Sequence, residues 1–452
     1  MGAGKSTLGP QLAQRLGRPF VDVDAEIERA HGPIADLFGA RGEADFRELE
    51  ANVVRDIASR EPSVVALGGG VVETDGLLDA LDAFVVLLAV DVDSAWERVR
   101  GSGRPLAEDE EEFRTRYDAR APRYADAAHA VARDVDDAVL AAAGVRVAVG
   151  SLELLGDLVG EQAGVALVTD PHVGGIHGAA AQLALGERLA STHEVPAGEA
   201  AKGVDVAQRL WRELRIPRAG MLVALGGGCV VDVSGFVAAT YLRGVRWTVV
   251  PTTLVAQVDA AIGGKTAVDL PEGKNLVGAF HWPAATVVDP ALLETLPERE
   301  WREGMAEVVK TGLLCGEPLW ELPTPDLVRR CAAFKAAVCF RDPYDRGERA
   351  MLNLGHTFAH ALEAAADFEG VTHGSAVALG LLAALRLSGA SVEVVERVLA
   401  PEPVRVDRER AWAALQRDKK RGLVLLDETG PKWDVDVPDT DVRSALDALI
   451  AD

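Results

Sequence analysis

Two apolar runs that each end in three glycines constrain the fold of this chain most. They are "VVALGGGVV" at residues 64–72 and "MLVALGGGCVV" at residues 221–231. Buried parallel strands read as near-continuous apolar runs, and glycines mark places where the backbone approaches a ligand closely. Helical patterns alternate with strand patterns in both halves, as in "GPQLAQRLGR" followed by "FVDVD". The sequence therefore predicts α/β folds with ligand sites in both halves.

The chain is expected to form three domains. Its 452 residues are too many for one ordinary core. An acidic and then alanine-rich helical stretch ends in a glycine at residue 144, and "VRVAVGSLELLGDLV" then begins with a strand. After about residue 300 strand signals fade, and "WREGMAEVVKTGLL", "LVRRCAAFKAAVCF" and "HTFAHALEAAADF" have helical spacing. We expect α/β domains over 1–144 and 145–300, followed by a mainly helical domain over 301–452.

The charge balance narrows the class of partner. The chain has 47 Lys and Arg against 70 Asp and Glu, a net charge of -23, which argues against nucleic acid or a membrane surface as the main partner. The four cysteines show no C-x-x-C spacing, no signal peptide is recognisable, and no apolar run reaches the length of about 18 residues that a membrane span needs. We expect a cytoplasmic enzyme acting on small molecules.

The first residues, "MGAGKST", match most of the phosphate-binding pattern G-x-x-x-x-G-K-[ST]. If Gly4 is the second glycine of that pattern, the first falls two residues upstream of Met1. Lys5 could then reach terminal phosphates, Ser6 could bind magnesium, and backbone amides would face anionic oxygens. The alternative is a lysine-bearing helix cap after a glycine turn.

Acidic and basic residues downstream favour the nucleotide site. "FVDVD" is expected to place Asp22 and Asp24 on one face at the end of a strand, where one could orient hydrated magnesium and the other accept a substrate hydroxyl. Arg47, Arg104 and Arg120 are of the kind that clamps a carboxylate or a developing phosphoryl charge.

With these motifs, residues 1 to about 143 resemble shikimate kinase. The resemblance implies a P-loop kinase-like parallel sheet with helices on both faces, and ATP with magnesium as cosubstrate. It implies that Asp24 orients or deprotonates the attacking hydroxyl and that Arg104 belongs to a lid. The implied ATP- and magnesium-binding residues are Gly2, Gly4, Lys5, Ser6, Thr7, Asp22 and Arg104, and the implied shikimate-binding residues are Asp24, Arg47, Gly69, Gly70 and Arg120.

The resemblance departs from the family at its start. The first strand, which would sit in the middle of the sheet, and the first glycine of the loop are missing from the sequence. We expect the written start to lie inside the natural reading frame, so that the chain as given binds ATP weakly and phosphorylates shikimate slowly or not at all. The alternative is a degenerate kinase that is retained as a scaffold.

Histidine spacing after residue 300 predicts a metal site. His356 and His360 are four residues apart and share a helix face, and His373 follows in "THGSAV". With Glu307 these residues offer the nitrogen and oxygen ligands that zinc takes, and Thr357 excludes the H-E-x-x-H protease pattern. The spacing does not decide which histidines bind the metal.

The glycines at 226–228 suit the close approach of a pyrophosphate, with Asp232, Thr252 and Thr253 positioned for the rest of a dinucleotide. The alternative is a tight strand-to-helix turn without a ligand.

Residues 145–452 closely resemble 3-dehydroquinate synthase. The resemblance rests on five segments in order: "ALGGGCVVDVSGFVAATYLRG", "VPTTLVAQVDAAIGGKTAVD", "GKNLVGAFHWP", "LPEREWREGMAEVVKTG" and "LNLGHTFAHALEA". It implies a Rossmann-like α/β domain, a helical metal-binding domain, and a homodimer in which Arg243 reaches the neighbouring site. It also assigns zinc or cobalt to Glu307, His356 and His373, and leaves His360 to the substrate phosphate.

The same resemblance implies the other site residues. For NAD they are Glu199, Lys202, Gly227, Gly228, Asp232, Thr252, Thr253, Asp259 and Lys274. For the substrate they are Arg243, Asp259, Lys265, Asn275, Lys310, Lys335, Arg349, His360 and Lys420. The residues expected to take part in catalysis are Asp24 in the first domain and Lys265, Lys310, Arg349 and His360 in the others.

Three positions depart from the synthase pattern. Ser375 stands where "HGE" is typical, Ala197 replaces the aspartate of a "DGE" stretch, and Val231 replaces a glycine before Asp232.

The leading interpretation is a fused enzyme with two activities of the shikimate route. One alternative makes the first domain non-catalytic, and the other is a metal-dependent polyol dehydrogenase or another sugar-phosphate cyclase of the same architecture.

Overall fold

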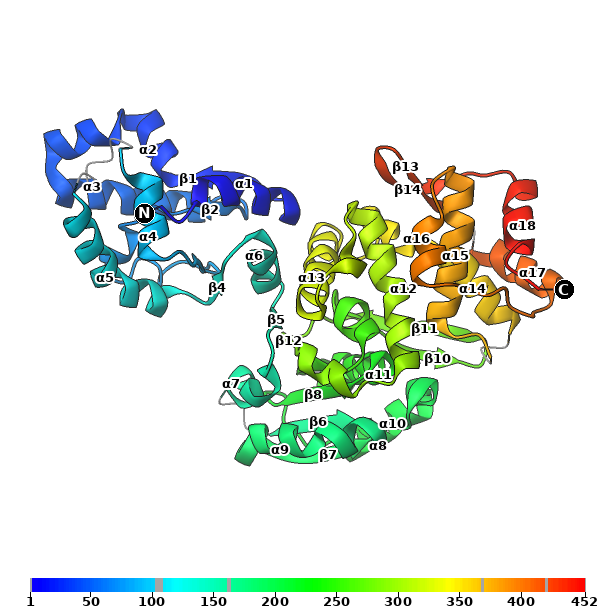
Figure 1. The fold of residues 1–452 in the computed structure, drawn as a ribbon. Helices are drawn as coiled ribbons and strands as arrows, with labels where there is room; N and C mark the ends of the chain where they lie inside the picture. The colour runs from blue at the N-terminus through cyan, green and yellow to red at the C-terminus, as the bar shows by residue number, and fades with distance from the viewer. Residues whose placement is uncertain (1, 102–108, 161–163, 367–369, 419–421, 452) are drawn as a thin grey trace. The chain divides into compact units, whose positions relative to one another are not determined.

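The computed structural model describes residues 2–101, 109–160, 164–366, 370–418 and 422–451. The chain separates into two compact units, Met1–Ala143 and Gly144–Asp452. Each unit is described by itself, and both are traced in Figure 1. Over the described residues, no helix combines the length and the apolar character needed to cross a membrane.

Unit 1 is built from short parallel strands and the helices that follow them. Its helices are α1 (Lys5–Leu16), α2 (Val23–His31), α3 (Ile34–Ala58), α4 (Val92–Val99), α5 (Glu110–Ala127) and α6 (Val135–Ala142). Its strands are β1 (Phe20–Asp22), β2 (Val64–Ala66), β3 (Val86–Leu88) and β4 (Ala130–Ala132). Aspartates at 91, 109 and 134 start α4, α5 and α6 because each side chain accepts a backbone N–H of the first turn.

The strands of unit 1 are parallel, as expected, but they occur in two pairs. Among the described residues β1 pairs with β2 and β3 pairs with β4, and no strand joins the two pairs. The helices bury apolar side chains against the strands, and Val23 and Ile27 of α2 are fully buried.

Unit 2 contains a six-stranded sheet in the order β5-β12-β9-β8-β6-β7, in which every pair is parallel. The strands are β5 (Val145–Val147), β6 (Val165–Thr169), β7 (Leu189–Glu194), β8 (Met221–Gly226), β9 (Arg246–Pro251) and β12 (Ala285–Val288). Strands β6 and β8 are buried along their whole length, which explains why their sequences are continuous apolar runs.

Helices cover this sheet through two apolar clusters. One cluster contains Leu210 of α10 (Val204–Glu213) and Val237 of α11 (Gly228–Thr240). The other contains Leu155 of α7 (Leu155–Val159) and Leu185 of α9 (Ala179–Leu185). The short helix α8 (Pro171–Val173) follows β6, and an antiparallel hairpin of β10 (Lys265–Leu270) and β11 (Gly273–Phe280) packs beside α11.

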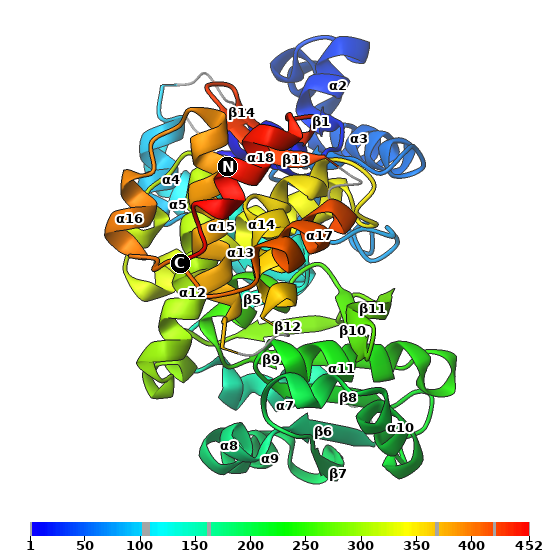
Figure 2. The same ribbon diagram turned by 90° about the vertical axis from the view of Figure 1, so that its right-hand side faces the viewer.

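The rest of unit 2 is mainly helical, and in Figures 1 and 2 its part after residue 355 lies at the opposite end of the unit from β6, β7 and β8. Its helices are α12 (Glu298–Cys315), α13 (Thr324–Arg341), α14 (His356–Ala365), α15 (His373–Ser388), α16 (Glu393–Val398), α17 (Arg408–Asp418) and α18 (Asp439–Asp447). A hairpin of β13 (Leu423–Asp427) and β14 (Gly430–Val435), which the sequence did not predict, packs against α15.

Two glycines allow α14 and α15 to touch through their backbones. Gly355 precedes α14 with φ of 79°, a conformation that favours glycine. A side chain at Gly380 of α15 would place its Cβ 2.0 Å from the carbonyl oxygen of Gly355. This contact brings the start of α14 close to the middle of α15.

Candidate active sites

A cavity of about 1400 Å³ in unit 2 gathers most of the residues predicted for NAD, substrate and metal. It lies where the loops after β8 and β9 meet hairpin β10–β11 and helices α12, α13, α14 and α15. The predicted residues in its wall are Glu199, Lys202, Gly227, Gly228, Asp232, Thr252, Thr253, Asp259, Lys265, Lys274, Asn275, Lys310, Lys335, Arg349, His356, His360 and His373.

The end of the cavity beside the sheet has the geometry of a dinucleotide site. Strand β8 ends at Gly226, and α11 begins at Gly228, so the N-terminus of α11 opens onto the cavity. A Cβ at Gly227 would lie 3.0 Å from Thr253 Cγ2, so a larger residue would fill the turn. The Oγ1 of Thr252 is buried and has no hydrogen-bond partner among the described residues, which leaves it for a ligand.

Lys202 is the central charge at this end. Its Nζ lies 2.9 Å from Asp232 Oδ2, 3.6 Å from Glu199 Oε1 and 3.7 Å from Asp269 Oδ1. Burial disfavours the ammonium form, but these carboxylates outweigh it and raise the pKa of Lys202. Val231, which departs from the synthase pattern, is a residue of α11 whose side chain is buried in the core, and the Lys202–Asp232 pair is still formed.

The opposite end carries buried cations. Lys335 Nζ lies 2.7 Å from both the carbonyl and the Oδ1 of Asp259. Lys310, whose side chain is 2% exposed, pairs with Glu307 and lies 3.9 Å from Asp259 Oδ1. Arg349 donates to the carbonyl of Gly263 at 3.0 Å, while its buried Nε has no hydrogen-bond partner among the described residues. The cavity is therefore suited to an anionic ligand.

Glu307, His356 and His373 form a candidate metal centre, with their ligand atoms all within 4.8 Å of one another. Glu307 Oε1 lies 3.4 Å from His356 Nε2 and 3.3 Å from His373 Nε2. Two imidazole nitrogens and one carboxylate oxygen are a donor set that catalytic zinc sites use. His360 lies beside this group, with its ring centre 5.6 Å from that of His356.

Electrostatics favour a cation at the metal centre. Burial favours a protonated carboxyl, but Lys310 and the two histidines hold the pKa of Glu307 well below its usual range. Burial and Lys310 lower the pKa of His356, which keeps its imidazole neutral and able to bind a metal. At His373 burial is outweighed by hydrogen bonds and charge from Glu307 and Glu363, which raise its pKa to about 10. The carboxylates around His373 thus attract positive charge.

Among the described residues, two of those predicted for this site are not in the cavity wall: Glu307, which is buried behind it, and Arg243. Arg243 lies in a turn after α11, where Leu242 and Arg243 both have positive φ, of 52° and 65°. Lys420 lies outside the described residues.

Several charged residues at the site were not predicted from the sequence. Asp345 pairs with Lys265 at 2.6 Å, and Asp269 receives the backbone N–H of Asn275 at 2.7 Å. Glu303 and Glu363 lie beside His373. Helical spacing could have found the last two, because Glu303 is four residues before Glu307 and Glu363 is three after His360.

In unit 1 the start of α1 has the arrangement of a magnesium and phosphate site. Gly4 caps α1 in a left-handed conformation, and Lys5 and Ser6 open the helix. Ser6 Oγ donates to Asp22 Oδ2 at 2.8 Å, so the two oxygens predicted to bind magnesium lie together.

The expectation that Asp24 ends a strand is wrong. Strand β1 stops at Asp22, whose Oδ1 accepts the N–H of Asp24 at 3.1 Å and caps α2. Asp24 therefore lies in the first turn of a helix rather than on the strand face of Asp22. Its carboxylate still approaches the glycine turn, because a Cβ at Gly68 would lie 3.1 Å from Asp24 Oδ1.

The predicted shikimate arginines lie together and are paired with acidic residues. Arg120 donates from Nε and Nη2 to Glu73 at 3.0 and 2.8 Å. Arg47 lies 2.8 Å from Glu50 and 3.3 Å from Glu73. A Cβ at Gly70 would lie 2.1 Å from the guanidinium of Arg47, so the glycine makes room for that arginine. Arg104 lies outside the described residues.

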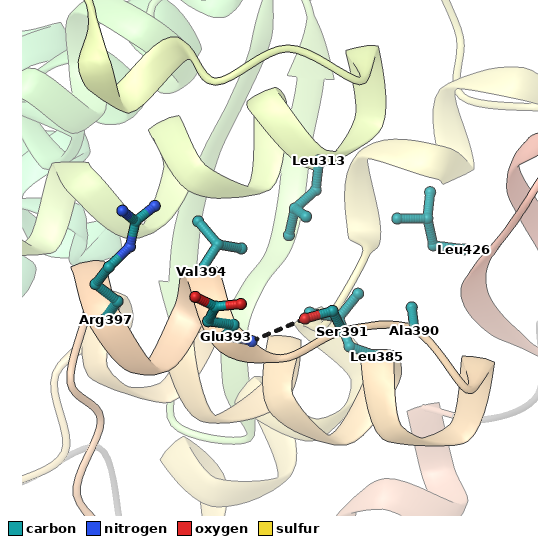
Figure 3. A pocket seen from close by; sticks show the side chains of 8 residues that line it. All are labelled: Leu313, Leu385, Ala390, Ser391, Glu393, Val394, Arg397 and Leu426. Carbon is teal, nitrogen blue, oxygen red and sulfur yellow. Dashed lines mark hydrogen bonds between the residues drawn. The ribbon is translucent and has the colours of Figure 1, made fainter.

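A second cavity, of about 400 Å³, contains none of the predicted site residues. Figure 3 shows the side chains of its wall, of which Glu393 and Arg397 are the charged ones. It is mainly apolar and brings no cluster of catalytic groups together.

Comparison with known proteins assigns each part of the chain to a family. The family described as "Shikimate kinase" matches residues 1–145. The families described as "3-dehydroquinate synthase N-terminal" and "3-dehydroquinate synthase C-terminal" match residues 192–303 and 304–421.

Individual relatives agree. The 3-dehydroquinate synthase of Latilactobacillus sakei is 46% identical over 240 residues, which are 49% of this chain and 67% of that protein. That of Gloeobacter violaceus is 42% identical over 342 residues, which are 66% of this chain and 94% of that protein. The structure of 2-epi-5-epi-valiolone synthase from Streptomyces hygroscopicus, with NAD+ and Zn2+ bound, aligns with a TM-score of 0.61 and 25% identity over 68% of this chain and 96% of that one. The chain belongs to the 3-dehydroquinate synthase family and carries a shikimate kinase domain fused ahead of the synthase.

Proposed function

We propose that unit 2 converts 3-deoxy-D-arabino-heptulosonate 7-phosphate to 3-dehydroquinate and phosphate, using NAD and zinc. One observation carries the proposal: a single cavity joins a glycine turn at a helix N-terminus, a three-residue metal centre and a group of buried cations. A simple dehydrogenase has no need of the cations, because its substrate has no phosphate and carboxylate to hold.

The residues present fit both cofactors. The orphaned hydroxyl of Thr252 and the turn at Gly227 suit a dinucleotide, and the donor set of Glu307 with two histidines suits zinc or cobalt. When bound, NAD supplies a hydride acceptor that is restored within each cycle, and zinc supplies a Lewis acid for the substrate's alcohol and ketone oxygens. The same cofactor pair is bound in the 2-epi-5-epi-valiolone synthase structure.

The chain's own groups then hold the substrate in register. Lys265, Asn275, Lys310, Lys335 and Arg349 supply fixed cations and an amide for the phosphate and carboxylate. His360, whose ring centre lies 5.6 Å from that of His356, is proposed to meet the phosphate. Holding both anionic ends keeps the substrate in one position while it is oxidised, loses phosphate, is reduced and closes into the new ring. No intermediate then has to leave the site. The homodimer with Arg243 at the neighbouring site, the contact of Lys420 with substrate, and the division of unit 2 near residue 300 stay predictions.

Turnover is expected to require NAD without net formation of NADH, because the hydride returns to the substrate within each cycle. The measurement follows NADH absorbance and phosphate release together, with the full chain, zinc and limiting NAD. The proposed reaction gives many phosphates per NAD and a flat NADH signal. Release of reduced cofactor in proportion to product would instead establish a polyol dehydrogenase.

We further propose that unit 1 phosphorylates shikimate with ATP and magnesium. The Ser6–Asp22 pair would hold the magnesium ion that accompanies ATP. Arg47 and Arg120, which lie together, would hold the carboxylate of shikimate. Lys5 stands at the start of α1, where it can reach the terminal phosphates. Asp24 lies in the first turn of α2 beside the turn at Gly68 and is proposed to orient the attacking hydroxyl.

Replacing Lys5 with alanine is expected to abolish shikimate phosphorylation by unit 1 and to leave the synthase rate unchanged, because Lys5 is proposed to hold the terminal phosphates of ATP. Coupled assays of both activities on the wild-type and variant chains measure this.

If the wild-type chain neither binds ATP nor phosphorylates shikimate, unit 1 is a retained scaffold.

A further inference from the structure

His373 is the metal ligand that depends most on support from elsewhere. It is the first residue of α15, and its side chain is 40% exposed, compared with 12% for His356 and 1% for Glu307. A side chain at a helix end with this exposure can take several rotamers. Two acidic residues on other helices, Glu363 of α14 and Glu303 of α12, contact this ligand or the backbone next to it.

Glu363 faces the far side of the His373 ring. Its Oε1 lies 3.6 Å from His373 Nδ1, whereas His373 Nε2 lies 3.3 Å from Glu307 on the other side. The side chain of Glu363 is only 7% exposed, so its carboxylate has few alternative positions. A carboxylate beside one ring nitrogen keeps the proton on that nitrogen and presents the lone pair of the other to the metal.

Glu303 holds the backbone that carries His373. Its Oε2 accepts the N–H of Gly374 at 2.5 Å, and its Oε1 accepts the hydroxyl of Thr372 at 2.5 Å. The first N–H groups of a helix have no partner within it, so Glu303 caps α15 from a neighbouring helix. Gly374 permits this approach, because a Cβ there would lie 2.5 Å from Glu303 Cα.

His356 is oriented in a different way. Its Nδ1 lies 3.3 Å from the carbonyl oxygen of Leu354, two residues earlier in the same segment. A neighbouring peptide carbonyl therefore orients the His356 ring, as the Glu363 carboxylate orients the His373 ring. Glu303 and Glu307 lie one helical turn apart on α12, which therefore supplies both a metal ligand and the cap of a second ligand's helix.

We propose that Glu363 and Glu303 are positioning residues that fix the ring and the backbone of His373 in the metal site. The inference rests on the proposed metal centre of Glu307, His356 and His373. Neither carboxylate is a metal ligand in this assignment, and each acts through His373.

The test measures zinc affinity of the full chain by competition with a chromophoric chelator, without substrate or NAD. Glu363→Ala is expected to weaken zinc binding by about 10- to 100-fold. Glu363→Gln should lose less, about 3- to 10-fold, because its amide oxygen still accepts the ring N–H. Glu303→Gln should lose about 10-fold, since one amide oxygen cannot accept from both Gly374 and Thr372. Glu298→Gln, on the exposed start of α12, is the charge-matched control and should bind zinc as the wild type does.

Thermal unfolding of the zinc-free variants identifies any that fail to fold, and if Glu363→Ala is one of them, Glu363→Gln carries the test. Zinc affinities of Glu363→Gln and Glu303→Gln equal to wild type would overturn the inference, as would an equal loss in the Glu298→Gln control. Wild-type protein that binds no zinc would instead refute the metal centre itself, so the two failures are distinguishable.

Discussion

Replacing His356 with alanine in the full chain is expected to remove bound zinc and abolish cyclisation. His356 supplies one of three protein ligands, and its imidazole is held neutral by burial and by Lys310, as metal binding requires. His373→Ala is expected to have the same effect. Metal content after gel filtration and phosphate release from the substrate measure the two losses separately.

His360→Ala is the matched control, because it removes a histidine from the same helix face. It should keep the metal and raise the substrate concentration needed for half-maximal rate, since His360 is proposed to hold the phosphate. Equal metal retention in the three variants would contradict the assignment of ligands.

Lys310→Met is expected to destabilise the zinc-free protein by about 3–5 kcal/mol, the usual cost of removing one partner from a buried ion pair. Lys310 is 2% exposed and pairs with Glu307, which is 1% exposed, and it also faces Asp259. The variant leaves the buried carboxylate of Glu307 without its lysine, whereas Asp259 keeps Lys335 at 2.7 Å. Zinc beside Glu307 restores a positive charge, so the loss should be smaller in the zinc-loaded protein.

Urea unfolding with and without zinc measures this difference, and Lys432→Met, at an exposed position, controls for the loss of a lysine. The same loss of stability in both metal states would show that Lys310 does not compensate the charge of Glu307. The variant should also lose cyclisation, because Lys310 lines the substrate cavity.

Much of the site could be predicted because it lies in continuous sequence motifs. The glycine run at 226–228 follows a buried strand and opens a helix, as the apolar pattern indicated. Helical spacing placed His356 and His360 on one face, but only the family resemblance assigned the metal to His356 and not to His360.

The parts that were missed depend on contacts between distant segments. Glu303 reaches Thr372 and Gly374 across about 70 positions of sequence, and Asp345 meets Lys265 across 80. No periodicity within one element encodes such contacts. The error at Asp24 has a local cause, because alternation in "FVDVD" indicated a strand while the side chain of Asp22 favours a helix start.

The backbone contact between Gly355 and Gly380 affects how natural variants of this family should be interpreted. Neither glycine is among the residues predicted to bind substrate or metal, yet a methyl group at Gly380 would meet the Gly355 carbonyl at 2.0 Å. Relief of that overlap requires α14 and α15 to move apart, which separates His356 from His373 because each begins one of those helices. An alanine at either glycine should therefore weaken metal binding as the loss of a ligand does. A comparison of sequences that checks the ligand residues alone would overlook such a change.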